Sequence, residues 1–183
     1  MNILDTSIAD VKIVQSVPHR DARGAFARLF CARELQPVLG RREIVQINHS
    51  RTGQAGTVRG LHFQRAPHAE TKMVRCVRGR IWDVAVDLRA GSPTFLRWHA
   101  QELSPDDGQM LVVPEGFAHG FQALEPESEL LYLVTACYHP SAEGGLRHDD
   151  PRLALPWPLP PQNVSPRDLT HPLLGADFAG LES

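Results

Sequence analysis

Short runs of alternating or β-branched residues follow one another along most of this chain, and turn signals separate them. The runs are, in order, VKIVQSV, REIVQINHS, TVRGLHFQ, KMVRCV, RIWDVAVDLR, FLRWHAQEL, MLVVP, FAHGFQAL and ELLYLVTACY, and the breaks include GQAG, AGSP, SPDDG and EPES. Strands at this spacing are typical of β-sandwiches and β-barrels. The pattern predicts an all-β protein, with one helix near residues 32–39, ARELQPVL.

The chain beyond about residue 140 has a different composition, because it is rich in proline: DDPRLALPWPLPPQNVSPRDLTHP. Proline has no amide hydrogen to donate to a sheet, so we expect an ordered tail with a short helix and no further sheet. Trp157 and several leucines predict that this tail packs on the body. A length of 183 residues suits one core, so residues 1–183 are interpreted as a single domain.

Charge and cysteine content exclude several classes of protein. A formal net charge of −2 gives no overall basic signal for nucleic acid, and no apolar run reaches the length of a membrane span. The N-terminal stretch MNILDTSIADVK does not resemble a signal peptide. Three scattered cysteines (Cys31, Cys76 and Cys137) indicate reduced thiols in a cytoplasmic protein. Cys76 and Cys137 lie in strand-like runs, which predicts buried thiols.

Several predicted strands place a polar group on an otherwise apolar face. His119 shares a face with two phenylalanines in FAHGFQAL, and Tyr132 shares one with aliphatic residues in ELLYLVTACY. In RIWDVAVDLR one face is apolar, and the other carries Asp83 and Asp87. This pattern favours a barrel whose interior holds a ligand.

The stretch TVRGLHFQRAPHAETKMVRC brings three groups with different proton chemistry into predicted sheet interior: Arg59, His62 and Lys72. Arg59 and His62 are three residues apart, so a regular strand would point their side chains to opposite faces. Gly60 between them could mark a β-bulge that redirects one of the two side chains. Histidine titrates near neutral pH and can act as a general base. A base beside cations suits removal of a proton next to a carbonyl, because negative charge then develops on the carbonyl oxygen.

Two further residues fit such chemistry. The phenol of Tyr132 could donate a proton to a carbanion, and Asp168 in SPRDL could fix the tautomer of His62. Each residue taken alone also has a structural interpretation. A single histidine or tyrosine in a strand is often a satisfied core residue, lysine and arginine are usually solvated, and Asp168 could cap a turn.

A metal site is the alternative that the same residues raise. Small cupin-type barrels bind metals through two histidines one residue apart, a carboxylate and a later histidine, for which His62, Glu70 and His119 are the candidates here. The residue two positions after His62 is Gln64 and not a second histidine. We therefore expect no catalytic metal.

The order of several motifs resembles that of dTDP-4-dehydrorhamnose 3,5-epimerases over residues 9–172. These motifs are DARGAF, QINHS, GTVRGLHFQ, KMVRCVRGRIWDVAVDLRAGSPTFLRW, LVVPEGFAHGFQAL, LLYLVTACYHPSAEGG, DDPRLALPWP and SPRD. The resemblance implies a cupin-like jelly-roll barrel, a homodimer, no metal and no organic cofactor. The family inverts C3 and C5 of a nucleotide-linked 4-keto-6-deoxy sugar, in dTDP-L-rhamnose or related deoxysugar biosynthesis.

The resemblance also implies roles for single residues. His62 corresponds to the base, Asp168 to its dyad partner, Tyr132 to the acid on the opposite face, and Lys72 to the group that stabilises the enolate. Further positions match residues that bind the substrate, with Arg59 and Arg23 on the diphosphate, Arg23 either from the same chain or from a second one, and Phe26 stacked on the base. The predicted binding set is Arg23, Phe26, Arg28, Gln46, Asn48, Arg59, His119, Tyr138, Glu143 and Arg167.

The chain departs from the family pattern after RGAF. Ala27 and Arg28 stand where the family usually has an aromatic residue and a glutamate that contacts the nucleotide base. A cation in place of an acceptor changes base recognition, so the nucleotide stays open. Inversion of one carbon only, action on a different nucleotide sugar, and a non-catalytic sugar-binding barrel are the remaining alternatives. A non-catalytic sugar-binding barrel would not need a base, a phenol and a lysine, and this chain has all three.

Overall fold

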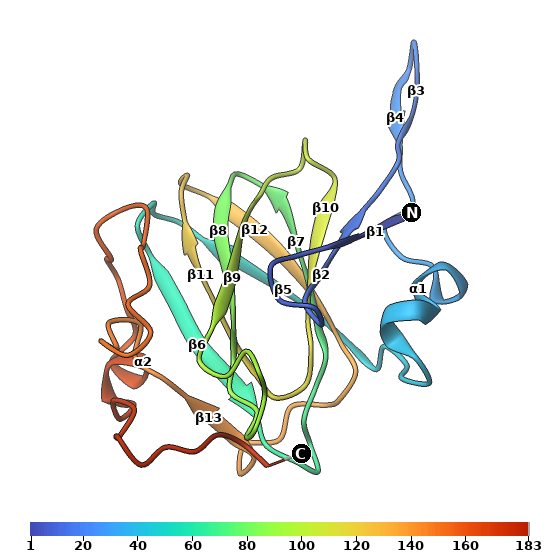
Figure 1. Cartoon of the computed structure of the whole chain (residues 1–183). Coiled ribbons are helices and arrows are strands. Elements are labelled where there is room, and N and C mark those ends of the chain that lie inside the picture. The colour runs from blue at the N-terminus through green and yellow to red at the C-terminus, as the bar shows by residue number, and fades with distance from the viewer. Residues whose placement is uncertain (183) are drawn as a thin grey trace.

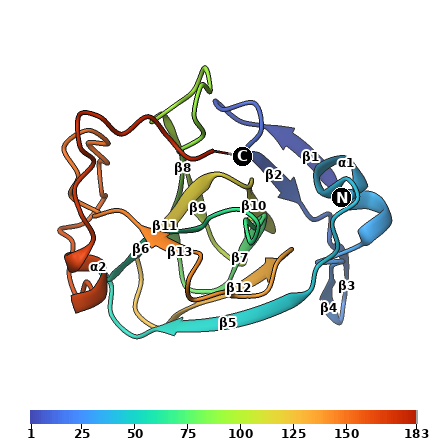
Figure 2. The same cartoon turned by 90° about the horizontal axis from the view of Figure 1, so that it is seen from below.

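A computed structural model describes residues 1–182, and two facing antiparallel sheets form its body. In the first sheet the strands follow the order β1 (Asn2–Asp5), β2 (Lys12–Gln15), β10 (Gln109–Val113), β7 (Lys72–Arg78), β12 (Ser128–Val134) and β5 (Gln46–Thr52). In the second they follow the order β13 (Glu143–Gly145), β6 (Val58–Gln64), β11 (Phe117–Ala123), β8 (Ile81–Asp87) and β9 (Trp98–Leu103). Seen end-on, the two sheets enclose a common interior (Figure 2).

One hairpin and two helices lie outside these sheets. The strands β3 (His19–Asp21) and β4 (Gly24–Phe26) form a hairpin that projects away from the body (Figure 1). Helix α1 (Ala32–Leu39) coincides with the predicted segment, and helix α2 (Pro166–Thr170) is the short helix expected in the tail. Neither of these helices, the two in residues 1–182, is long and apolar enough to cross a membrane. The predicted all-β, jelly-roll-like fold is confirmed, as two open sheets and not as a closed barrel.

The interior between the sheets is built by the alternation that the sequence predicted. Ile81 and Ala85 of β8 pack in one cluster with Phe117 and Phe121 of β11 and with Tyr132 of β12. The other face of β8 contributes to a second cluster under the C-terminal tail, and a third cluster lies on the outer face of the first sheet under α1. Every residue of β8 is buried, because the tail covers the face that would otherwise meet solvent.

Gly60 interrupts the pairing between β6 and β11, at the position where the sequence suggested a bulge between Arg59 and His62. His62 stands opposite His119 and Arg59 opposite Phe121, so β6 places one more residue in this stretch than β11 does. Gly60 has a φ of 120°, and a Cβ atom there would lie 2.6 Å from the Cα of Gly120. Only glycine fits this backbone, and the predicted bulge is confirmed.

Two expectations about local structure are wrong. The segment Glu143–Gly145, which lies before most of the prolines, does form a strand, because β6 offers it a free edge. Residue Gln162 in the tail also makes an isolated bridge with Thr57. Cys137 is exposed, because β12 ends at Val134 and the chain has left the sheet there, whereas Cys76 is buried as expected.

Candidate active site

The interior opens into a cavity of about 870 Å³, and a smaller cavity of about 230 Å³ adjoins the same residues. His62, Lys72 and Tyr132 line both cavities. His62 lies on β6 of the second sheet, while Lys72 and Tyr132 lie on β7 and β12 of the first. The three residues on which the sequence argument rested therefore meet from the two facing sheets.

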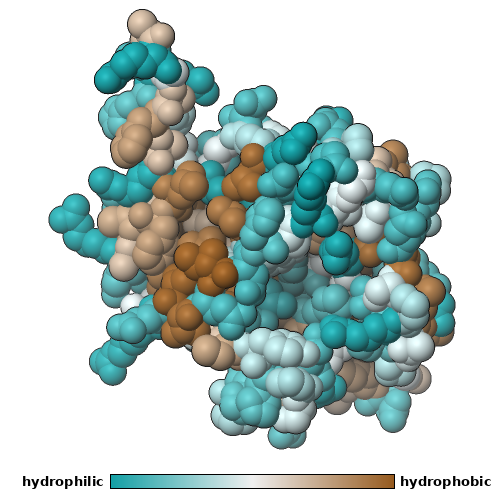
Figure 3. Space-filling model, turned by 180° about the vertical axis from the view of Figure 1, so that it is seen from behind, coloured by the Kyte–Doolittle hydropathy of each residue, from teal (hydrophilic) through white to brown (hydrophobic). Residues whose placement is uncertain are grey.

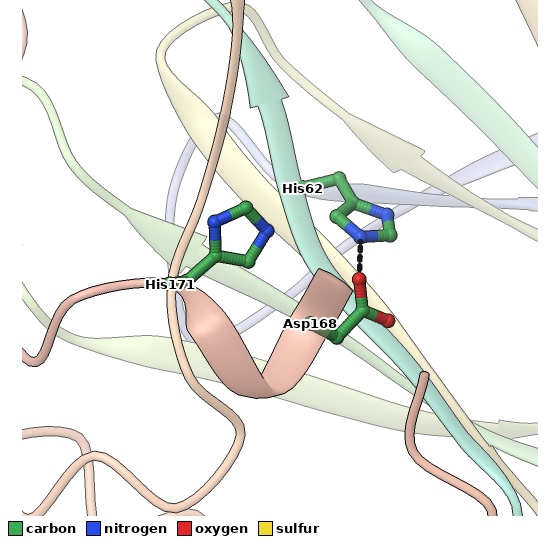
Figure 4. A group of neighbouring side chains, drawn as sticks. All are labelled: His62, Asp168 and His171. Carbon is green, nitrogen blue, oxygen red and sulfur yellow. Dashed lines mark hydrogen bonds and ion pairs between the residues drawn. The ribbon is translucent and has the colours of Figure 1, made fainter. Parts of the chain in front are cut away.

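His62 is joined to Asp168 by a hydrogen bond of 2.7 Å from its Nε2 to the carboxylate Oδ1 (Figure 4). Asp168 lies in α2, whose N-cap Ser165 accepts a hydrogen bond from the Asp168 amide at 3.1 Å. The second carboxylate oxygen accepts the Gly60 amide at 3.2 Å. The bulge and the short helix thus hold the carboxylate from two sides, and Nδ1 is the nitrogen of His62 left to act on a substrate.

The environment of Asp168 keeps its carboxylate ionised. Burial alone would raise the pKa of Asp168, but the hydrogen bond and the charge of His62, together with the Gly60 amide, outweigh it and lower the pKa. An ionised carboxylate at Nε2 holds the proton on that nitrogen, so Nδ1 of neutral His62 carries a lone pair. This is the arrangement that a general base requires.

Tyr132 has the opposite character, because its phenol is held in the protonated form. Burial raises the pKa of Tyr132, and the negative charge of Asp83 raises it further, while the Ser50 hydroxyl and Arg59 offset this only in part. A phenol of this kind is neutral at physiological pH. It can donate a proton where carbanion character develops, and it readily recovers the proton afterwards.

A second histidine–carboxylate pair lies behind this phenol. His119 donates from Nε2 to Asp83 Oδ1 at 2.7 Å, and both side chains are almost wholly buried. The His119 ring stands edge-on to Tyr132, with the ring centroids 5.9 Å apart. The other oxygen of Asp83 has no hydrogen-bond partner within residues 1–182. The sequence placed Asp83 on the face of β8 that proved to be the interior one, but it contained no signal for the pairing with His119.

Lys72 brings positive charge to the side of the cavity next to His62. Its Nζ lies 3.2 Å from Glu70 Oε1 and donates to the His62 carbonyl at 3.5 Å. Because Glu70 pairs with Lys72 and His119 pairs with Asp83, the metal ligands considered from the sequence do not form one cluster within residues 1–182. The group whose ligand atoms do lie within 4.8 Å of one another is His62, Asp168 and His171.

Most of the predicted binding residues lie around these cavities. Arg59 lines the larger cavity and donates to Thr52 Oγ1 at 3.3 Å, and Arg167 lines it while pairing with Glu143. The smaller cavity is lined by a connected polar set, in which Gln46 donates to Asn48 at 2.9 Å and the Tyr138 hydroxyl donates to Glu143 at 2.8 Å. The structure brings these predicted residues together with the catalytic candidates: Gln46, Asn48, Arg59, His119, Tyr138, Glu143 and Arg167.

Three predicted binding residues are not brought to the cavities of their own chain. Arg23 and Phe26 lie on the projecting hairpin, where Arg23 pairs with Asp21 at 2.6 Å and the Phe26 side chain is 75% exposed. Arg28 pairs with Glu34 in the first turn of α1, and the N-terminal amine shares the same carboxylate. Arg28 is thus held in an ion pair outside the cavities of its own chain. The hairpin likewise holds Arg23 and Phe26 away from those cavities.

His171 is the neighbour of the dyad that sequence reasoning did not single out. It follows α2 as the C-cap residue, and its ring lies 6.2 Å from that of His62 (Figure 4). Ser50 and Asp83 were likewise not assigned to the site. A local pattern could have flagged Asp83, because an acid on an interior face needs a partner, but proximity of residue 171 to residue 62 depends on the fold of the tail.

The comparisons with known proteins agree on one family. The family model described as dTDP-4-dehydrorhamnose 3,5-epimerase matches residues 5–176. A dTDP-4-dehydrorhamnose 3,5-epimerase from Sinorhizobium fredii is 43% identical over 92% of this chain and 87% of its own length.

Solved structures extend the agreement to the fold. An epimerase from Legionella pneumophila, in complex with dTDP-4-keto-L-rhamnose, has a TM-score of 0.91 and 37% identity, and the match covers 100% of this chain and 98% of that one. A 3'-monoepimerase from Streptomyces bikiniensis, in complex with dTDP-quinovose, has a TM-score of 0.85 and 30% identity over 92% of this chain and 86% of that one.

Proposed function

The chain belongs to the dTDP-4-dehydrorhamnose 3,5-epimerase family, and we propose that it inverts carbons next to the C4 ketone of a nucleotide-linked 4-keto-6-deoxy sugar. The substrate we assign is dTDP-4-dehydro-6-deoxyglucose, with inversion at C3 and C5, in dTDP-L-rhamnose or related deoxysugar biosynthesis. One observation carries the proposal. His62, whose imidazole is hydrogen-bonded to the carboxylate of Asp168, lines the same cavities as the protonated phenol of Tyr132 on the facing sheet.

The reaction needs only proton transfers. The lone pair on Nδ1 of His62 takes the proton from the carbon next to the ketone, and the electron pair of the broken C–H bond moves onto the C4 oxygen. The ammonium group of Lys72 stabilises this enolate oxygen. Tyr132 then gives its proton to the opposite face of the same carbon, which inverts the centre and leaves an imidazolium and a phenolate. Exchange with solvent restores both groups before the next inversion.

The diphosphate is assigned to the arginines at the larger cavity. Arg59 and Arg167 both line it, and guanidinium groups match phosphate oxygens in a bidentate geometry. Arg167 is already paired with Glu143, so binding of a phosphate would compete with that carboxylate. The connected side chains of Gln46, Asn48 and Tyr138 offer polar contacts to the nucleotide beside it.

We further propose that the protein is a homodimer in which each hairpin completes the other chain's site. Exposed apolar side chains gather at the foot of the hairpin (Figure 3). The large exposed apolar residues of this part of the chain are Val17, Phe26, Leu29, Phe30, Val45 and Ile47. A second copy would cover such a patch, and it would carry Arg23 and Phe26 toward the partner's cavity. The three free cysteines suit the reducing cytoplasm.

Incorporation of deuterium tests the reaction directly. The protein is incubated in heavy water with the 4-keto-6-deoxy sugars of thymidine, uridine, cytidine and guanosine diphosphate, and mass spectrometry locates the label. Label at C3 and C5 of the thymidine sugar is the expected result. Label at C3 alone would instead assign a single-carbon epimerase, the activity named for the relative from Streptomyces bikiniensis. No incorporation from any of the four would end the proposal.

A variant connects the chemistry to the site. His62→Ala should abolish exchange at both carbons while its thermal unfolding stays close to that of the wild type, since the His62 side chain is only partly buried. Exchange at the wild-type rate in this variant would mean that another group is the base.

A further inference from the structure

His171 carries a ring nitrogen, Nε2, that the proposed mechanism leaves unused. Its Nε2 atom is shielded from solvent and has no hydrogen-bond partner within residues 1–182. The ring points toward the His62–Asp168 pair from the C-terminal end of α2 (Figure 4). A buried polar atom without a partner costs free energy, so its position next to two other ligand atoms calls for a physical explanation.

The backbone next to His171 fixes where this ring lies. Gly145 of β13 packs against the imidazole so closely that a Cβ atom at Gly145 would collide with the ring, Nε2 included. A glycine in β13 thus allows the ring to sit between that strand and α2. The orientation of Nε2 toward the dyad is therefore set by packing, and it does not depend on a hydrogen bond.

The geometry is close to that of a three-ligand metal site. One ligand atom each from His62, Asp168 and His171 lies within 4.8 Å of the other two. Ligands bound to zinc at about 2.0–2.2 Å stand roughly 3.3 Å apart in a tetrahedron. The His62 and Asp168 atoms, which are 2.7 Å apart, therefore have to separate slightly, and the His171 nitrogen has to move in by up to about 1.5 Å. The larger cavity, which His62 and Asp168 line, provides a path for entry and room for a water as fourth ligand.

We propose that His62, Asp168 and His171 form an inhibitory site for a divalent transition metal, with Zn²⁺ as the best fit to two imidazoles and one carboxylate. Inhibition, which rests on the proposed function, follows from the chemistry of the imidazole. A metal on Nε2 of neutral His62 leaves the ring proton on Nδ1, so the nitrogen that faces the substrate can no longer accept a proton. The metal also takes Asp168 away from the dyad.

Nearby charges set the expected strength. Lys72 and Arg167 are cations at the same cavity and oppose a second cation, although Glu70 and Glu143 partly neutralise them. The metal also has to break the 2.7 Å hydrogen bond between His62 and Asp168. We therefore expect inhibition at micromolar zinc and reversal by a chelator, in contrast to the permanent occupancy of a structural site.

Direct binding is measured first, because it does not depend on activity. The full-length protein is freed of metal with a chelator and titrated with Co²⁺, whose visible absorption reports nitrogen and oxygen ligation, and with Zn²⁺ by equilibrium dialysis. One ion per chain is expected. His171→Asn should weaken binding at least about 10-fold, because one of three ligands is lost. Unchanged affinity in His171→Asn would overturn the proposal.

Matched variants test two other places where zinc could bind. Cys137→Ser removes an exposed thiol, and His68→Asn removes one ring of a stacked histidine pair, His68 and His139, whose centroids are 3.8 Å apart. Both variants should bind zinc as the wild type does. Loss of binding in either one, with binding kept in His171→Asn, would place the ion elsewhere and refute the assignment.

The activity assay then separates this proposal from the proposed function. Zinc should inhibit deuterium exchange in the wild type, and His171→Asn should need at least about 10-fold more zinc for half inhibition. Exchange activity with no zinc binding would leave the epimerase assignment standing and reject the metal site. Zinc binding that depends on His171, in a protein without exchange activity on any of the four nucleotide sugars, would support the metal site and reject the function.

Discussion

The imidazole of His119 meets the phenol of Tyr132 edge to face, with the ring centroids 5.9 Å apart and the planes at 81°. Behind it, Asp83 accepts the Nε2 proton of His119 at 2.7 Å and keeps one oxygen without a partner within the described chain. The negative charge that raises the pKa of Tyr132 is thus held in place by a histidine that itself packs against the phenol.

The ionisation of Tyr132 can be followed directly, because the chain has two tyrosines. Since burial and Asp83 raise the pKa of Tyr132 above its ordinary value of about 10, the phenol should still be protonated at pH 10. In a Tyr138→Phe background, absorbance at 295 nm should show no titration up to that pH. Ionisation of Tyr132 near pH 9 would contradict the account of its environment.

Asp83→Asn should shift that titration to lower pH. The substitution removes the charge that raises the pKa of Tyr132 and keeps the size of the side chain, so the direction follows from electrostatics alone. The same absorbance titration measures it, with Asp87→Asn as a control on the same strand. An upward shift, or an equal shift in the control, would show that Asp83 does not act on the phenol through its charge.

Asp168→Asn should reduce kcat for exchange by about 10²–10⁴-fold, the range that a positioned proton-transfer group contributes. The amide cannot carry the charge that holds the proton on Nε2 of His62, so the lone pair on Nδ1 is no longer assured. Steady-state deuterium incorporation measures kcat, and Asp149→Asn, at an exposed carboxylate paired with Arg147, is the matched control. A loss below 10-fold, which is under that range, would remove Asp168 from the dyad.

The dimer proposal predicts that two inactive variants restore each other. A His62→Ala chain and an Arg23→Ala chain are mixed by refolding, so that about half of the dimers contain one of each. If the hairpin crosses to the partner, one site of each mixed dimer combines an intact His62 with an intact Arg23. Activity should then rise to about a quarter of the wild-type value. Activity equal to the mean of the two parents would show that Arg23 serves its own chain.

A buried arginine at the root of the hairpin predicts a stability effect. Arg75 is 5% exposed and donates from Nη2 to the Ser16 hydroxyl at 2.7 Å, and that hydroxyl donates to the Arg28 carbonyl at 2.9 Å. Ser16 precedes the hairpin and Arg28 follows it, so the Ser16 hydroxyl joins the two legs of the hairpin, meaning the two segments that connect it to the body. Ser16→Ala should cost about 1–3 kcal/mol of unfolding free energy, because a buried guanidinium loses its acceptor.

Urea unfolding measures this cost, with Ser141→Ala as a control at an exposed hydroxyl that contacts His139. A cost in Ser16→Ala no larger than in the control would show that the two legs are held in some other way.

The sequence by itself determined nine of the thirteen strands in residues 1–182 and the side chains proposed for the chemistry, but it did not predict β1, β3, β4 or β13. Alternation is a local property, since neighbouring side chains of a strand point to opposite faces, so the residues that share a face with His119, with Tyr132 and with Asp83 could be named without any contact being known. The opposite faces expected for Arg59 and His62 likewise suggested a bulge at Gly60, and the pairing of β6 with β11 shows the register shift there.

Only the tertiary structure decided which of these groups act on one another. Asp168 is 106 residues from His62 along the chain, and their hydrogen bond depends on how the proline-rich tail returns to β6. The same return brings in His171, and the pairing of β8 with β11 joins Asp83 to His119. The projecting hairpin separates Arg23 and Phe26 from the cavity of their own chain. Such contacts arise from the closure of long loops, which no local preference of residues encodes.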